Sequence, residues 1–518
     1  MLMHSDSPDI GPRPVSAGQA EERGTNPDTK TGLLEPGETC WAIERANRFA
    51  VIIDGADYFR AAKSAILKAR HHVLLIGWDF DARVALEPEP EQQTLPGPNR
   101  IGRFLNWIAR ERPDLRVRIL KWDLGFLRTL GRGETPFFLL NWLIGRKIRL
   151  KLDGAHPTGA AHHMKLMVID DTLAFCGGID MTVGRWDTRA HRKDCQARQT
   201  PHGSPLGPWH DATTCADGPL ARRLAELARE RWQRATGERL EAPPLDNDPW
   251  PDGLEPDFRD AQIGIARTLA AFKDYPQVCE IEALTFRAIA AARRTLYIES
   301  QYFASRRVAE AIAARLREPD GPEVVIINPD SADGWLEAKA MDSARSRLLR
   351  LVQRADRHGR FRVYYPVNEA GQPIYVHAKI LCVDDALLKI GSANLNNRSL
   401  GFDTECDVAI EAAASADPAQ ARAFILRQRN ELLAEHLGRS TDAVAAALEA
   451  AEGSLIGALD ALNTGPKRLV PLQPSPLTAD EEIIAESDLV DPERPASLRH
   501  EVRARLPGWG AERNASSA

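Results

Sequence analysis

One pattern occurs twice in this sequence, as HMKLMVID at residues 163–170 and as HAKILCVD at residues 377–384. In each copy a His and a Lys flank a single residue, and an Asp follows after four mostly apolar positions. Apolar runs of this length predict a buried strand. Because alternate side chains of a strand share one face, the His and the Lys of each copy point the same way.

The flanking sequence is duplicated too. Residues 65–76 and 288–299 each have the layout of a helix end that feeds a strand. An amphipathic helix is then expected at 101–110 and at 308–316, followed by strands at 117–120 and 148–152 in one copy and at 324–327 and 361–365 in the other. Strands that alternate with helices predict an α/β layered unit. The repeated order predicts two such units that face each other.

We expect five segments. Residues 1–40 form a disordered N-terminal segment, 41–240 a first half, 241–256 a proline-rich acidic linker, and 257–437 a second half. Residues 438–518 form a helical extension, helical to about residue 462, and a polar tail.

Composition sets further limits. The chain has 518 residues and a formal net charge of −6, so no overall positive field favours nucleic acid. No window approaches 18 continuous apolar residues, and the first residues lack the apolar core of a secretory signal. The seven cysteines have no metal-ligand spacing and are expected to be free thiols. We expect a cytoplasmic or peripherally membrane-associated protein, although other export routes stay open.

Two imidazoles and two ammonium groups around one centre suit phosphodiester cleavage. One His can attack phosphorus while the other protonates the departing alcohol oxygen, and the lysines stabilise the non-bridging oxygens. Gly177 and Gly391 are expected to allow the close backbone approach that a phosphate oxygen requires. This chemistry needs no metal, and no carboxylate cluster suited to one is evident, so neither metal nor cofactor is expected.

A single His-x-Lys pair usually indicates only a half-exposed sheet face. Two complete sets at matching positions of a repeat favour catalysis. Further short blocks accompany them: GRWD at 184–187 with His191, PWHD at 208–211, IESQYF at 298–303 and NRSLG at 397–401. Together, these motifs resemble the phospholipase D superfamily over roughly residues 45–440, and the blocks look like those of its eukaryotic-type lipases.

That resemblance implies two pseudo-symmetric α/β/α sandwich halves with the active site at their interface. The motif residues then form the catalytic set, which comprises His163, Lys165, Asp170, His377, Lys379 and Asp384. The resemblance implies His163 as the nucleophile and His377 as the general acid. It also implies a carboxylate behind each imidazole, for which Glu405 is assigned to His377 and Asp211 to His163.

The residues after each motif differ between the copies. Gly178 and Asp180 stand where the second copy has Ser392 and Asn394. We predict phosphate contacts for Gly178, Ser392 and Asn394, with the second half binding phosphate more fully, and no catalytic role for Asp180.

The resemblance implies hydrolysis of glycerophospholipids such as phosphatidylcholine to phosphatidic acid, and transfer of the phosphatidyl group to alcohols. The alternatives are a cardiolipin synthase-like transferase, a nuclease or other phosphodiesterase of the same superfamily, and a non-enzymatic lipid-binding module. Cardiolipin synthases usually begin with transmembrane helices, and nucleases often carry basic tracts; neither feature is evident in this sequence. A lipid-binding module would be expected to lack a motif His or Lys, and all four are present. The head group and the natural acceptor stay open.

The expected partner is a phospholipid at a membrane surface, with no nucleic acid, and one chain should suffice for activity. The segment 137–144, flanked by Arg132, Arg146 and Lys147, could lie in the membrane interface. The competing interpretation is a helix or lid packed on the core.

Overall fold

The computed structural model describes residues 32–89, 93–123, 141–331 and 335–474. The first half contains β1 (Ala42–Ile53), α1 (Gly55–Lys68), β2 (His72–Gly77), α2 (Ile101–Glu111), β3 (Arg116–Trp122), β4 (Ile148–Asp153), β5 (Lys165–Ile169), β6 (Leu173–Gly177), β7 (Trp209–His210), β8 (Ala212–Asp217) and α5 (Gly218–Thr236). The second half repeats the order of the main strands and helices, with additional short elements.

The second half contains β9 (Phe258–Leu269), β10 (Val278–Cys279), α6 (Glu280–Ala291), β11 (Thr295–Glu299), α7 (Arg306–Arg317), β12 (Glu323–Ile327), α8 (Trp335–Ala355), β13 (Phe361–Val367), β14 (Tyr375–Val376), β15 (Ile380–Val383), β16 (Leu387–Gly391), α9 (Asn397–Gly401), β17 (Glu405–Glu411), a 3-10 turn (Ala412–Ala414) and α10 (Pro418–Leu437). Beyond it lie α11 (Thr441–Ala450), α12 (Leu455–Leu462) and β18 (Arg468–Pro471).

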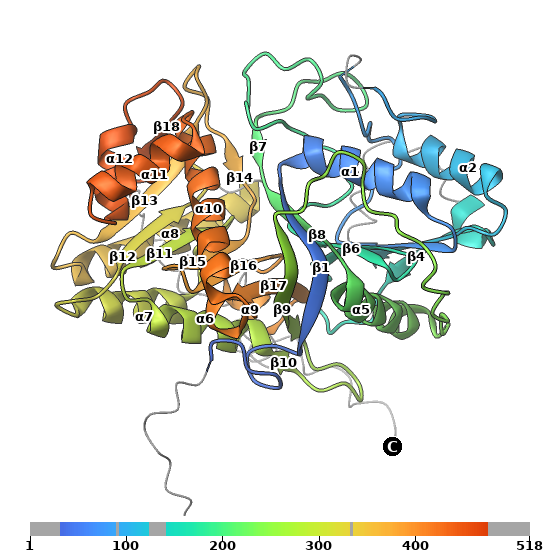
Figure 1. Ribbon diagram of the computed structural model, residues 1–518, viewed down its shortest axis with the longest axis horizontal. Helices are drawn as coiled ribbons and strands as arrows, with labels where there is room; N and C mark the ends of the chain where they lie inside the picture. The colour runs from blue at the N-terminus through green and yellow to red at the C-terminus, as the bar shows by residue number, and fades with distance from the viewer. Residues whose placement is uncertain (1–31, 90–92, 124–140, 332–334, 475–518) are drawn as a thin grey trace, which may run out of the picture. The chain divides into compact units, whose positions relative to one another are not determined.

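One mixed sheet runs through both halves (Figure 1). Among the described residues its order is β18-β13-β12-β11-β15-β16-β17-β9-β1-β8-β6-β5-β2-β3-β4, with β10 paired to β9. β1 and β9 pair antiparallel at the centre of the sheet. Outward from β1 the order is β8-β6-β5-β2-β3-β4, and outward from β9 the corresponding strands follow in the same order, β17-β16-β15-β11-β12-β13. The repeat seen in the sequence is therefore a pseudo-twofold arrangement about the β1–β9 contact.

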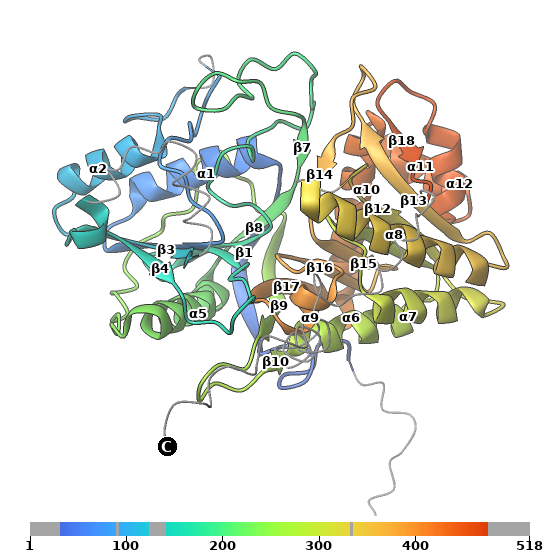
Figure 2. The ribbon, with the colours of Figure 1, turned by 180° about the vertical axis from the view of Figure 1, so that it is seen from behind.

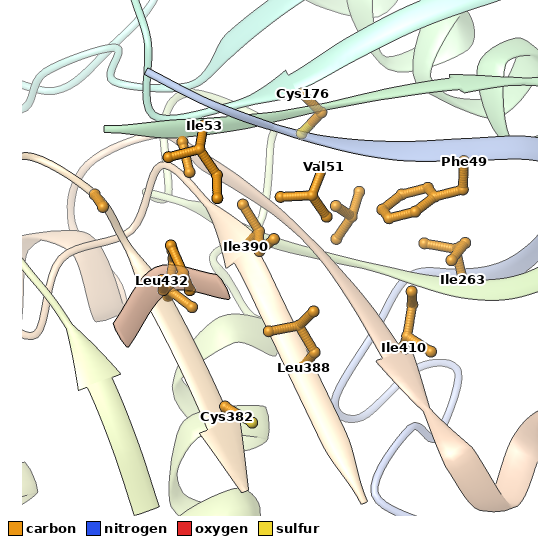
Figure 3. Close-up of a cluster of buried hydrophobic side chains, with 14 of the residues drawn as sticks. Phe49, Val51, Ile53, Cys176, Ile263, Cys382, Leu388, Ile390, Ile410 and Leu432 are labelled. Carbon is orange, nitrogen blue, oxygen red and sulfur yellow. The ribbon is translucent and has the colours of Figure 1, made fainter. Parts of the chain in front are cut away.

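Helices cover both faces of this sheet (Figure 2). Buried side chains of α5 and α10 share one hydrophobic cluster that extends across both halves, and Figure 3 shows part of it around Phe49, Val51 and Ile390. On the opposite face, α1 and α2 pack in a cluster of the first half, whereas α6 and α7 pack in a cluster of the second. The predicted pair of α/β/α sandwich halves is confirmed.

The helices that follow β8 and β17 show why these segments fold as they do. In α10, the Asp417 side chain accepts hydrogen bonds from the first backbone N–H groups, and Pro418 occupies the first turn. Gly438 ends the helix with a φ of 60°, the left-handed conformation that glycine adopts most readily. Gly237, with a φ of 75°, ends α5 in the same way.

Two short contacts join the halves beside the motif strands. β7 and β14 form a separate parallel pair, in which Trp209 lies opposite Tyr375 and His210 opposite Val376. An isolated parallel bridge joins His162 to Thr404. Each contact lies just before a motif histidine, so the start of each motif strand is held by the other half.

The chain ends require one correction. Residues 32–40, predicted to be disordered, pack on the second half: the backbone N–H groups of Leu33 and Leu34 donate to Glu411, and Cys40 is buried. In the extension, β18 pairs antiparallel with β13 and so enlarges the sheet. Along the described part of the chain, none of the helices combines the length and apolar composition that a bilayer crossing requires.

Candidate active site

The two motif histidines lie together at the interface of the halves. His163 lies two residues before the start of β5, and His377 lies three residues before the start of β15. Their ring centroids are 6.5 Å apart and the ring planes are inclined by 55°. The predicted meeting of two imidazoles from separate halves is therefore what the fold produces.

The carboxylates behind the imidazoles come from the opposite halves, so the predicted pairing was wrong. His163 Nδ1 lies 3.0 Å from both Glu405 oxygens, and His377 Nδ1 lies 2.7 Å from Asp211 Oδ2. The bridges between the halves are the physical reason. The His163 N–H donates to Thr404 O, next to Glu405, and the His377 N–H donates to His210 O, next to Asp211.

The lysines sit beside the histidines, as the strand alternation predicts. Lys165 Nζ donates to the carbonyl of His163 at 2.7 Å and lies 3.1 Å from Asp180 Oδ2. Lys379 Nζ donates to the carbonyl of His377 and, at 3.2 Å, to Gln301 Oε1. Lys165 therefore has a carboxylate partner, whereas Lys379 has a neutral one.

Burial controls the electrostatics of the site. Burial and the lysine ammonium groups hold the pKa of His163 and of His377 well below the usual value. Burial, reinforced by the charge of Lys165, lowers the pKa of Lys379 to about 7 even though Asp211 opposes the shift. Burial raises the pKa of Glu405 to about 8, against the charge of Lys165. Burial therefore favours the uncharged forms of the two histidines and of Lys379, and a bound phosphate anion would favour their protonated forms. A positive charge that develops on His163 would in turn favour the ionised form of Glu405.

Both motif aspartates lie away from the histidines, which corrects their assignment as catalytic residues. Asp170 lies beyond the far end of β5, about 17 Å along the strand from Lys165. Its carboxylate accepts hydrogen bonds from the backbone N–H groups of residues 70–72 and from Asn247. Asp384 accepts from the N–H groups of residues 293–295.

The two aspartates have matching conformations, with φ angles of 51° and 50°. Each ties the turn after its motif strand to the start of the neighbouring strand, β2 or β11. The spacing of the motif aspartate is therefore a feature of the fold.

The residues after the motifs support the carboxylates. The Ser392 hydroxyl donates to Glu405 Oε2 at 2.5 Å and accepts from the Cys406 N–H. At Gly178, an added Cβ would lie 2.2 Å from Asp211 Oδ1. Ser392 thus positions Glu405, and Gly178 leaves room for Asp211. These contacts indicate that Ser392 and Gly178 support the carboxylates, and not the phosphate contacts that were predicted for them.

Gly177 and Gly391 also have a structural role in place of the predicted phosphate approach. An added Cβ at Gly177 would meet the Thr213 backbone, and one at Gly391 would meet Asp407, so these glycines allow close approach of strands. Asn394 is buried, and its Oδ1 has no hydrogen-bond partner among the described residues. Its predicted phosphate contact stays a prediction.

Several side chains of the site had no role assigned from sequence. Gln301 accepts from Lys379, and the Ser399 hydroxyl donates to Glu405 at 2.7 Å. Trp209 packs on the His377 ring, with centroids 5.0 Å apart, and stacks on Tyr375 at 4.6 Å. Tyr375 precedes His377 and Lys379 at alternating positions of one extended segment, which is the sequence signal that could have identified it.

The segment considered for membrane contact is only partly described. Residues 137–140 lie outside the described part of the chain. Trp142 is 2% exposed and donates from Nε1 to Asn106, so this residue belongs to the core. Ile144 is 84% exposed.

Comparisons with known proteins agree with this geometry. A family described as Phospholipase D matches residues 65–249, and one described as Cardiolipin synthase, PLD-like domain matches residues 285–423. Phospholipase D alpha 1 of Vigna unguiculata is 23% identical over 73% of this chain and 63% of its own length. Phospholipase D1 of Schizosaccharomyces pombe is 25% identical over 78% of this chain and 37% of its own length.

Among solved structures, phosphatidylserine synthase of Haemophilus influenzae Rd KW20 has 14% identity and a TM-score of 0.49, covering 76% of this chain and 88% of its own. The chain thus spans less than two thirds of the length of these two phospholipase D relatives. Between them, the two family matches cover most of the repeat and both histidine motifs. This chain belongs to the phospholipase D superfamily and contains two phospholipase D-like domains.

Proposed function

We propose that this protein is a phospholipase D that hydrolyses glycerophospholipids such as phosphatidylcholine to phosphatidic acid and transfers the phosphatidyl group to alcohols. The observation that carries this proposal is the crossed pairing, in which each motif histidine contacts a carboxylate of the other half, His163 with Glu405 and His377 with Asp211. The two imidazole centroids are 6.5 Å apart. Two imidazoles on opposite sides of one phosphorus suit a double displacement.

In the first step, His163 Nε2 attacks phosphorus and the bond to the head-group oxygen breaks. The Glu405 carboxylate orients the ring through Nδ1 and stabilises the charge that develops on it. The His163 side chain is 16% exposed and that of His377 is 5% exposed, which supports His163 as the attacking group.

His377 gives its proton to the departing oxygen in the same step, with Asp211 holding its Nδ1. It then takes a proton from water or an alcohol, which attacks the phospho-histidine. Lys165 and Lys379 stabilise the non-bridging oxygens in both steps. Every atom of this cycle comes from the substrate, the acceptor and this chain's side chains.

The lipid substrate is supported by the relatives, which are named phospholipases D. A membrane surface would then be the site of action, and the exposed Ile144 beside Arg146 and Lys147 is a candidate for peripheral contact. We expect one chain to suffice for activity, and the formation of both His–carboxylate pairs within one chain supports this.

The test is incubation with phosphatidylcholine vesicles and a primary alcohol, followed by mass spectrometry of the lipids. We expect phosphatidic acid and the phosphatidyl alcohol, both lost in H163N and H377N and kept in H358N, which alters an exposed loop histidine. Lipid left intact while single-stranded DNA is cut would replace this proposal with a nuclease.

A second candidate is transfer to a lipid alcohol, as in a cardiolipin synthase. The match of residues 285–423 to the family described as Cardiolipin synthase, PLD-like domain supports it. Adding phosphatidylglycerol to the vesicles separates the two: cardiolipin as the main product would favour the transferase, and phosphatidic acid the hydrolase.

A further inference from the structure

A second group of buried ionisable side chains lies behind the catalytic histidines and takes no part in the proposed reaction. It consists of Asp54, His191, His210 and Glu435, whose potential ligand atoms all lie within 4.8 Å of one another. Asp54 is 1% exposed, both histidines are 0% exposed, and the Glu435 side chain is 2% exposed. We call this group the His–carboxylate cluster.

Four separations within the His–carboxylate cluster are close to those between the ligands of one metal ion. His191 Nε2 lies 3.1 Å from Glu435 Oε1 and 3.4 Å from Asp54 Oδ2. His210 Nδ1 lies 2.8 Å from Glu435 Oε1 and 3.2 Å from Asp54 Oδ1. Ligands about 2.0 Å from a tetrahedral Zn²⁺ are about 3.3 Å from one another, so these separations need little adjustment.

The outward nitrogen of each ring has its own carboxylate. His191 Nδ1 lies 3.0 Å from Asp187 Oδ2, and His210 Nε2 lies 2.8 Å from Glu299 Oε2. Asp187 is in turn fixed by Arg198. Histidines that bind metal commonly donate their second N–H to a carboxylate in this way, which directs the free lone pair to the ion.

Hydrogen bonds alone do not satisfy the atoms that face the centre. His210 Nδ1 and Asp54 Oδ2 are buried and lack a hydrogen-bond partner in the described chain, even though His210 Nδ1 is close to two carboxylates. A hydrogen bond requires donor, hydrogen and acceptor to be nearly in line, whereas a cation placed between the groups contacts all of them. One divalent cation also balances the charges of Asp54 and Glu435 with both rings neutral.

The backbone at Asp54 points to the same conclusion. Asp54 occupies the N-cap position of α1, where an aspartate usually accepts from the first helical N–H groups, but its side chain makes no such bond. Its φ of 69° is in the left-handed region, which is unfavourable for a residue with a side chain. The carboxylate is instead turned into the His–carboxylate cluster.

We propose that the His–carboxylate cluster binds one divalent transition-metal ion, with Zn²⁺ the best fit to two imidazoles and two carboxylates. Four protein ligands leave no open position for substrate, so the ion has a structural role and does not enter the chemical step. It joins Asp54, His191 and His210 of the first half to Glu435 on α10 of the second. The backbone of His210 also accepts from the His377 N–H, so the ion fixes the segment that carries Asp211.

The experiment uses the full chain, treated with chelating resin and then with Zn²⁺, and measures bound metal by inductively coupled plasma mass spectrometry. The variants are H191N and E435Q. The matched control is H162N, which alters another buried histidine paired with a carboxylate, Asp153. Binding of Co²⁺ in place of Zn²⁺ adds a spectroscopic signature of tetrahedral N/O coordination, and none of these measurements depends on the lipid reaction.

We expect about one Zn²⁺ per chain in the wild type and in H162N, and at least about tenfold less in H191N and E435Q. A strong chelator should lower the Tm of the wild type by several degrees, and Zn²⁺ should restore it. The wild-type measurements decide the matter even if a variant fails to fold. Less than about a tenth of an equivalent of metal in the wild type, with a Tm insensitive to chelator, would overturn the proposal. Equal metal content in H191N, E435Q and the wild type would overturn it as well.

Discussion

The crossed pairing predicts that Glu405 acts with His163 and Asp211 acts with His377, and replacing each carboxylate by its amide tests this. Glu405 accepts from three groups, His163 Nδ1 and the hydroxyls of Ser392 and Ser399. In E405Q one oxygen remains, and the NH₂ group faces donors that it cannot satisfy. Loss of a hydrogen bond to a charged group costs about 1.5–3 kcal/mol.

The developing imidazolium adds to that cost, because E405Q also removes the negative charge behind it. We take this second contribution to be of similar size, which gives about 3–6 kcal/mol in total. At about 1.36 kcal/mol for each factor of ten, the chemical step should slow by about 10²–10⁴. D211N should show a loss in the same range, because Asp211 is equally buried and lies 2.7 Å from His377.

The assay separates the two pairs through the leaving group. A phosphatidyl ester of p-nitrophenol needs little protonation of its departing oxygen, so a variant damaged in the general acid should recover most of its rate on it. A variant damaged in the nucleophile should stay slow in a single-turnover burst. Crossed pairing requires E405Q to behave like H163N and D211N like H377N, whichever histidine is the nucleophile. If E405Q instead resembled H377N, the pairing drawn from these contacts would be refuted.

Three further outcomes follow from the same contacts. The pKa of Lys379, lowered to about 7, implies that kcat/KM falls as pH rises through about 7, because the ammonium form is lost above its pKa; K379R, measured over the same pH range, should lack this fall while being slower overall. D384A should lower the free energy of unfolding by about 2–4 kcal/mol, because three backbone N–H groups lose their acceptor, and urea denaturation measures the loss. I144E should weaken binding to anionic vesicles and leave the hydrolysis of a short-chain soluble lipid unchanged.

Each of these outcomes has a control. A pH profile for K379R that still falls near pH 7 would assign the titration to another group. D384A should keep a kcat close to that of the wild type wherever it is folded, since a large loss in the folded enzyme would return Asp384 to the catalytic set. W142A should lower stability, because Trp142 is buried, and equal losses on vesicles and soluble lipid in I144E would argue against membrane contact.

The sequence was sufficient for the features that depend on local periodicity. The alternation of His163 with Lys165, and of His377 with Lys379, placed each pair on one strand face, and the repeat of helix and strand signals predicted the two halves. The roles of Asp170 and Asp384 were missed because spacing along a motif does not tell which end of the strand faces the site. The pairing of Glu405 and Asp211 was missed because it depends on the register between halves, for which no local pattern exists.

The crossed carboxylates also bear on why both copies of the repeat belong to one chain. The first half contains His163 and Lys165 but lacks the carboxylate that orients His163, and the second half contains His377 but lacks Asp211. The two bridges, from His162 to Thr404 and from β7 to β14, place each histidine against the half that completes it. Neither copy can therefore form a complete histidine–carboxylate pair alone. Because each histidine is paired with a carboxylate of the other half, a substitution that weakens one bridge disturbs a histidine of one half and a carboxylate of the other. The interface between the halves is therefore part of the catalytic site.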